Sequence, residues 1–128
     1  LHAGLQNEER LAELIRISKC FVCVCDSKVI GRAFLVPQGH PTPIFDKEWA
    51  QIRMVGVHPD YAGKGIAKEL TRMCIEEARR LGEKTLALHT SEMMDAARHI
   101  YESVGFKKIK EIDPLFGKRY WLYQLEIG

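Results

Sequence analysis

The stretch from Val55 to Leu70, "VGVHPDYAGKGIAKEL", constrains the fold more than any other part of this sequence. An apolar run ends at His58 and Pro59, two glycines then flank Lys64, and a helical pattern follows directly. Glycines at a strand-to-helix turn let backbone N–H groups and a helix N-terminus face a phosphate. The stretch therefore predicts an anion site between a strand and a helix.

Hydrophobic periodicity predicts alternating helices and strands along the rest of the chain. Two strands joined through a helix predict a right-handed parallel crossover, and the hairpins add antiparallel pairs, so we expect an α/β or α+β fold. We expect helices over residues 7–18 (with Asn7 as N-cap), 65–81 and 92–104. Leu11, Leu14 and Ile15 are expected on the apolar face of the first helix and Met93 on that of the third. We expect strands over 49–57 and 84–90, a hairpin over 20–38 that turns at Asp26-Ser27-Lys28, and a last hairpin that turns around Asp113-Pro114 and Gly117.

Composition limits the function classes. The 128 residues suit one globular domain, 1–128, and a formal net charge of +2 gives no argument for nucleic acid or an anionic membrane as partner. No apolar run approaches the roughly 18 residues of a spanning helix, and the first residues lack the pattern of a signal peptide. We expect a soluble, cytoplasmic protein.

The four cysteines, three of them in the run "CFVCVC", superficially resemble a metal or redox motif. Metal-binding pairs usually sit on turns, whereas Phe21, Val22 and Val24 favour a β-strand here. No matching His or Cys pair follows. We therefore expect buried free thiols in a reducing compartment, no metal and no catalytic cysteine.

The glycine turn can be compared with known phosphate-binding loops. A P-loop needs four residues between its glycines, and a dinucleotide fingerprint needs a small residue where this chain has Lys68. The run from Ala62 to Ala67 instead resembles the acyl-CoA loop of the Gcn5-related N-acetyltransferase (GNAT) family. The similarity continues through "TLALHTSEMMDAARHIYESVGFKKI", with its Tyr-x-x-x-Gly-Phe ending at Tyr101–Phe106, and covers about residues 20–126.

The resemblance implies a mixed, largely antiparallel central sheet with helices on both faces and splayed central strands. It also implies that the single domain, 1–128, is N-terminally incomplete and lacks the family's first strand and helix. The implied activity is acetyl transfer from acetyl-CoA to a primary amine by direct attack on the thioester, and the alternative is a non-catalytic acyl-CoA-binding or regulatory module. The acceptor is a small-molecule or protein amine, and a homodimer is compatible with the resemblance.

The resemblance implies roles for the residues that match the family's motifs. The Val55 N–H is expected to polarise the thioester carbonyl and the Val57 N–H to bind the pantetheine arm. Ala62 replaces the family's usual Gln or Arg, so Lys64, Lys68 or Arg98 is expected to supply charge instead. The resemblance assigns acetyl-CoA contacts to Val55, Val57, Ala62, Gly63, Lys64, Gly65, Ile66, Ala67, Lys68 and Arg98.

Aminolysis also needs a proton acceptor for the amine and a proton donor for the CoA thiolate. Tyr101 matches the family's proton donor, although a tyrosine on an apolar helix face often only packs. Candidates for the base are Glu48, Gln51 acting through water, and His58, which more simply shapes a turn. We favour Glu48, for which the alternative is an exposed charge at the start of the strand. His89 is read as a satisfied strand histidine that could line the acceptor cleft.

Overall fold

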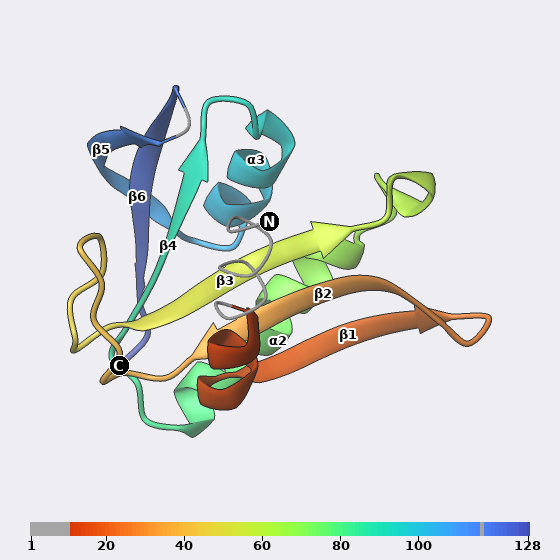
Figure 1. The fold of residues 1–128 in the computed structure, drawn as a ribbon, viewed down its shortest axis with the longest axis horizontal. Coiled ribbons are helices and arrows are strands. Elements are labelled where there is room, and N and C mark those ends of the chain that lie inside the picture. Colours follow the sequence, from red (N-terminus) through yellow and green to blue (C-terminus); the bar gives the residue numbers. More distant parts are fainter. Residues whose placement is uncertain (1–10, 116) are drawn as a thin grey trace.

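The computed structural model describes residues 11–115 and 117–128 and contains one six-stranded mixed sheet of order β1-β2-β3-β4-β6-β5 (Figure 1). The predicted N-cap Asn7 lies outside the described residues. The elements are β1 (Lys19–Cys25), β2 (Lys28–Val36), β3 (Ala50–Val57), a 3-10 turn (Pro59–Tyr61), α2 (Ile66–Arg80), β4 (Thr85–Ser91), α3 (Asp95–Ser103), β5 (Lys107–Leu115) and β6 (Lys118–Glu126); residues 11–17 are also helical.

Strand pairing confirms the predicted fold class. β3 and β4 are parallel and connected through α2, whereas the other neighbouring strands are antiparallel. The first hairpin turns at Asp26 and Ser27, whose φ angles of 50° and 64° match the left-handed residues of a tight hairpin turn. Helix α2 ends as predicted, because Gly82 adopts a φ of 78° directly after its last turn.

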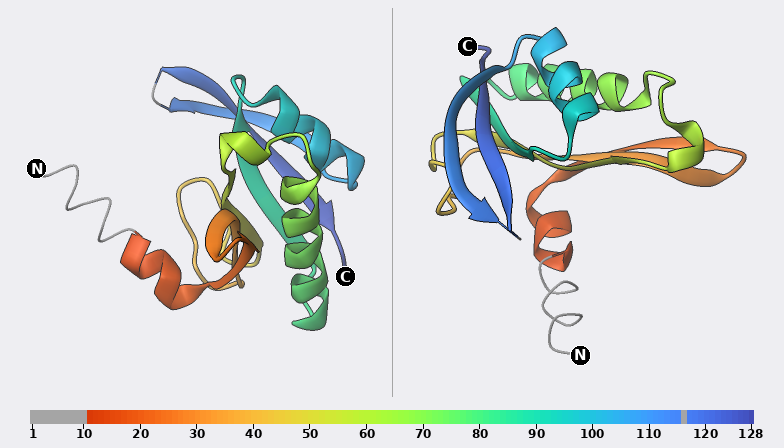
Figure 2. Two further views of the ribbon diagram at one scale, coloured as in Figure 1. Left: turned by 90° about the vertical axis from the view of Figure 1, so that its right-hand side faces the viewer. Right: turned by 90° about the horizontal axis from the view of Figure 1, so that it is seen from above.

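Helices cover both faces of the sheet (Figure 2). Helices α2 and α3 lie on one face, where Leu70, Cys74 and Ala78 are buried against Leu35 of β2 and other strand residues. The helix at residues 11–17 lies on the opposite face. The second face also carries a smaller cluster of Phe45, Ala87 and Leu122, and it is this face that becomes important for the site.

The prediction that the cysteine thiols are buried is wrong for three of the four. Only Cys74, inside α2, is buried; Cys20 is exposed, and Cys23 and Cys25 are half-buried. The physical reason is the position of β1 at the edge of the sheet, which leaves its outer face without a covering layer. Neighbouring Val22 and Val24 are exposed for the same reason.

Three local predictions also differ from the structure. Helix α3 begins at Asp95, three residues later than the start of the predicted range, and Met93 is 70% exposed instead of packing on the helix face. Asp113 and Pro114 belong to β5, at an irregularity in its pairing with β6, so the last hairpin turns only after Leu115. In the first helix Leu14 is buried, but Leu11 and Ile15 are exposed.

Candidate active site

The two central strands separate soon after they meet. β3 and β4 share only two register pairs, Ala50 with Leu86 and Gln51 with Ala87. Beyond Gln51 the strands diverge, and Figure 1 shows β3 running to the right and β4 running upward from the end where they meet. The remainder of β3 therefore has backbone groups on its β4 side that pair with no strand among the described residues, and these groups are free to bind an extended ligand.

A β-bulge interrupts β3 at the start of this divergence. Phe34 pairs with Arg53 and Arg32 with Gly56, so Met54 and Val55 together oppose one residue of β2. Met54 has a φ of 53°, a left-handed conformation that is uncommon for a residue other than glycine. Bulges re-aim backbone and side chains next to functional sites. The bulge thus sets the direction of the Val55 N–H, the group predicted to polarise the thioester.

The glycine turn leads from the end of β3 into α2. His58 Nδ1 accepts a hydrogen bond from the Asp60 backbone N–H at 3.1 Å, which confirms that His58 shapes the turn. Gly63 and Gly65 have φ angles of 77° and 81°, and a Cβ at either would meet no atom within 4 Å. Gly65 caps α2 without a side-chain hydrogen bond. Open space therefore faces the helix N-terminus, as an anion site requires.

The three cations predicted to help bind phosphate have different surroundings. Lys64 Nζ lies 5.8 Å from the centroid of the Tyr61 ring, next to the glycine turn. Lys68 is exposed in the first turn of α2. Arg98 forms an ion pair with Asp95, and its guanidinium carbon lies 4.9 Å from the Trp121 ring centroid. Ala62, Ile66 and Ala67 complete the turn with no charged group of their own.

Tyr101 is buried in the main core, 5% exposed, on the face of the sheet that α2 and α3 cover. Its ring meets the Phe106 ring edge-on at a centroid distance of 6.0 Å. Burial, followed by the neighbouring Cys74 thiol, raises the pKa of Tyr101 to about 12. The hydroxyl therefore keeps its proton at neutral pH.

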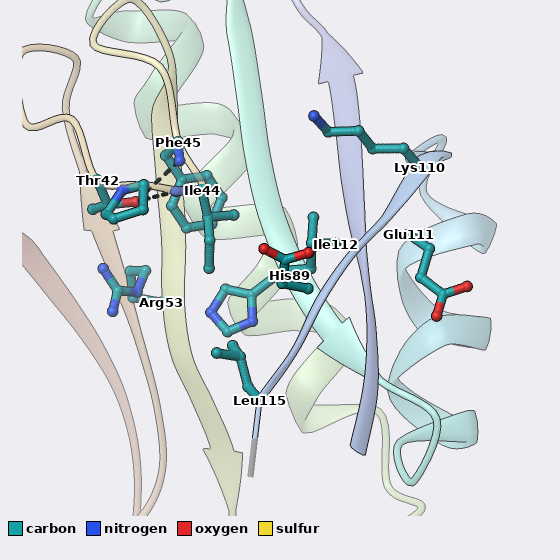
Figure 3. Close-up of a pocket in the computed structure, with 11 residues that line it drawn as sticks. Thr42, Ile44, Phe45, Arg53, His89, Lys110, Glu111, Ile112 and Leu115 are labelled. Atoms are coloured by element: carbon teal, nitrogen blue, oxygen red, sulfur yellow. Dashed lines mark hydrogen bonds between the residues drawn. The ribbon is translucent and has the colours of Figure 1, made fainter. Parts of the chain in front are cut away.

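A cavity of about 530 Å³ opens on the opposite face of the sheet, where the central strands diverge (Figure 3). A pocket of this size accommodates a small organic molecule. Its lining comes from the loop before β3, from β3 and β4, and from β5, namely Thr42, Pro43, Ile44, Phe45, Arg53, His89, Lys110, Glu111, Ile112, Asp113 and Leu115.

Arg53 and His89 face each other across the start of the divergence. Gln51 pairs with Ala87, and side chains two residues further along each strand lie on the same face. The His89 ring contacts the Phe45 and Tyr120 rings in tilted arrangements, at centroid distances of 5.7 Å and 5.4 Å. Burial first, then the Arg53 charge, lowers the pKa of His89, so the imidazole is neutral at pH 7.

The prediction that His89 is a satisfied strand histidine is wrong. Its buried Nδ1 has no hydrogen-bond partner within residues 11–115 and 117–128. The possibility that it lines a cleft is confirmed, since it contributes to the wall of the 530 Å³ cavity. The sequence analysis assigned no role to Arg53. Arg53 follows Gln51 by two positions on β3, so the two side chains lie on the same face of the sheet.

The predicted base, Glu48, is exposed in the loop before β3 and does not line the cavity. Gln51 is 1% exposed, and its Nε2 donates to the His40 carbonyl at 2.8 Å. His58 belongs to the turn beyond β3. Of Glu48, Gln51, His58 and His89, only His89 lines the cavity.

Across the described part of the chain, no three His, Cys, Asp or Glu side chains come together as a metal site. None of the helices in residues 11–115 and 117–128 combines the length and apolar character of a membrane-spanning segment.

Comparison with solved structures defines the fold class first. An acetyltransferase from Bacillus subtilis in complex with CoA superimposes with a TM-score of 0.75 at 18% identity, over 93% of this chain and 83% of that one. The sequence profile of the Acetyltransferase (GNAT) family matches residues 4–106, and this chain belongs to that family.

Curated relatives agree with this assignment. Human N-acetyltransferase 8B is 33% identical over 96 residues, which is 74% of this chain and 41% of the relative. N-acetylaspartate synthetase from Xenopus tropicalis is 33% identical over 95 residues, 73% of this chain and 33% of the relative. The chain thus spans less than half the length of these two proteins.

Proposed function

We propose that this protein transfers the acetyl group of acetyl-CoA to a primary amine by direct attack of the amine on the thioester. Family membership supports acyl transfer, and the names of the relatives support an amine acceptor. The proposal treats residues 1–128 as one GNAT domain that works without a covalent enzyme intermediate.

One observation carries the proposal: β3 departs from β4 at the bulge and then runs into an open glycine turn at the start of α2. An extended acyl-pantetheine arm can pair with the free edge of β3 in the gap, with the Val57 N–H as a donor. The amides of residues 63–67 would then receive the pyrophosphate of CoA, where the helix dipole favours negative charge. Side chains at either glycine would stand in this space.

Each step of the reaction has a candidate residue. The amine nitrogen forms a bond to the thioester carbon, while the Val55 N–H donates to the carbonyl oxygen as it becomes negative. When the intermediate collapses, the C–S bond breaks and the electron pair leaves with sulfur. Tyr101 donates its proton to that thiolate, and the amine's excess proton passes to a base.

The base has two candidates with different support. Glu48 is the candidate that the sequence predicts, and its carboxylate is exposed to solvent. His89 has the better position, because its imidazole lines the cavity from which an amine can approach the gap, whereas Glu48 does not line it. Replacing each by glutamine distinguishes them: loss of turnover with unchanged acetyl-CoA affinity identifies the base.

A second candidate function is acyl-CoA binding without turnover. The alanine at position 62, where the family usually has glutamine or arginine, favours it. Acetyl-CoA titration by calorimetry, followed by mass spectrometry of an amine mixture incubated with isotopically labelled acetyl-CoA, separates the two functions. Binding with labelled amide product supports the transferase, binding without product supports the module, and no binding contradicts both.

A further inference from the structure

We infer that the amine acceptor carries a carboxylate next to its amino group, as an α-amino acid does, and that Arg53 binds this carboxylate. The inference rests on the proposed acetyl transfer and adds the chemical class of the acceptor. It follows from the position of Arg53, from the character of its neighbours and from the charges that share the cavity.

Arg53 occupies the last position of β3 before the bulge, on the face that carries Phe45 and the cavity. Its side chain lines the cavity with His89 from the diverging strand (Figure 3). The bulge at Met54 and Val55 follows immediately in the chain. A molecule held by Arg53 is therefore beside the proposed acetyl-binding gap, on the side from which an acceptor can enter.

The guanidinium of Arg53 has only neutral neighbours among the residues that the structure describes. Its Nη1 lies 3.4 Å from Gln51 Oε1, and its Cζ lies 6.0 Å from the Phe45 ring centroid. Burial lowers the pKa of Arg53, but an arginine remains charged at neutral pH. A half-buried positive charge without an anionic partner is unfavourable, and a bidentate carboxylate satisfies it best.

The carboxylates that line the cavity form no ion pair with Arg53 among the described residues. Glu111 pairs with Arg119 at 2.8 Å, and Figure 3 shows its side chain pointing away from Arg53 and His89. Asp113 lines the cavity from β5, opposite the strand that carries Arg53. The lining thus combines the Arg53 guanidinium of β3 with Asp113 and Lys110 of β5, a mixed set of charges that can receive both groups of a zwitterion.

Matched pools of acceptors test the inference with isotopically labelled acetyl-CoA and mass spectrometry. One pool contains the twenty α-amino acids, a second contains the same compounds with every carboxyl group amidated, and a third contains the amines formed by decarboxylation. We expect labelled product from the amino acids, formed at least about tenfold faster than from the other pools, since hydrogen bonds to charged groups are the stronger class.

Variants of Arg53 connect that preference to the residue. Arg53→Gln is expected to lower kcat/KM for the amino-acid acceptor by about 10- to 150-fold more than for its amide, with acetyl-CoA affinity unchanged. Arg53→Lys should give an intermediate loss, because it keeps the charge but not the bidentate geometry. Arg79→Gln, which removes the same charge from the exposed end of α2, should change nothing.

Other outcomes overturn specific claims. Equal acetylation of amino acids and their amides by the wild type, or an Arg53→Gln loss that is equal for both pools, overturns carboxylate recognition and leaves acetyl transfer standing. Absence of product from all three pools overturns the amino-acid acceptor, and the calorimetry and amine mixture described for the proposed function then test the transfer itself. The melting-temperature shift caused by acetyl-CoA in each variant shows whether the domain is still folded.

Discussion

Substitution of Gly65 by glutamate gives the sharpest test of the phosphate site. The residue has a φ of 81°, and open space surrounds its missing Cβ, so the change costs left-handed strain but causes no steric overlap. That strain is about 1–2 kcal/mol. A carboxylate at the N-terminus of α2 recovers roughly 0.3–1 kcal/mol through the helix dipole. The net loss in the free energy of unfolding should be about 1 kcal/mol.

CoA binding should fall much further. The new carboxylate competes for the free amides of α2 and repels the pyrophosphate. Two like charges about 4 Å apart near a protein surface repel by about 4 kcal/mol, and solvent exposure reduces this to roughly half. We therefore expect at least about a 30-fold loss of CoA affinity by calorimetry.

Gly82 supplies the matched control. It lies at the other end of α2 with a φ of 78° and likewise has no atom within 4 Å of an added Cβ. Gly82→Glu should destabilise the domain slightly more than Gly65→Glu, because its charge opposes the helix dipole. It should leave CoA affinity intact. Equal CoA affinities for the two variants would refute the phosphate site at residues 63–67.

Three other predictions follow from the site and the core. Tyr101→Phe should keep folding and CoA affinity but lower kcat at least about tenfold in steady-state assays; normal turnover would make Tyr101 a packing residue. Incubation with acetyl-CoA alone should leave all four cysteines without a stoichiometric thioester by mass spectrometry, because the attack is direct; a thioester would require a ping-pong mechanism. The pKa values of Cys74, Tyr101 and Tyr123 are each raised to about 12, mainly by burial. These groups therefore bind their protons more tightly in the folded state than in the unfolded state. The free energy of unfolding should therefore fall as pH rises from about 9 to 12 in urea titrations, and a constant value would contradict that burial.

The sequence predicted the elements well because their signals are local. The 3.6-residue period of α2 and the apolar runs of β3 and β4 do not depend on distant contacts. The bulge could not be predicted, since Met54 takes a left-handed conformation without being Gly, Asn or Asp. The exposure of Cys20 depends on β1 being an edge strand, which is a property of the whole sheet.

The proposed phosphate-binding turn could be predicted from the sequence, because its residues are contiguous. The acceptor side could not. Arg53 and His89 lie 36 positions apart in the sequence and come together only through the register of β3 with β4. Each residue alone resembles an ordinary strand residue, and the lack of a charged partner for Arg53 is visible only in the assembled cavity.

The most direct measurement of the central claim is a crystal structure of the chain with acetyl-CoA. The account predicts the pyrophosphate on the amides of residues 63–67 and the pantetheine arm between β3 and β4. The thioester carbonyl should accept from the Val55 N–H, with the acetyl group open to the cavity that Arg53 and His89 line. An acetyl-CoA molecule bound elsewhere, or one whose acetyl group is closed off from that cavity, would contradict it.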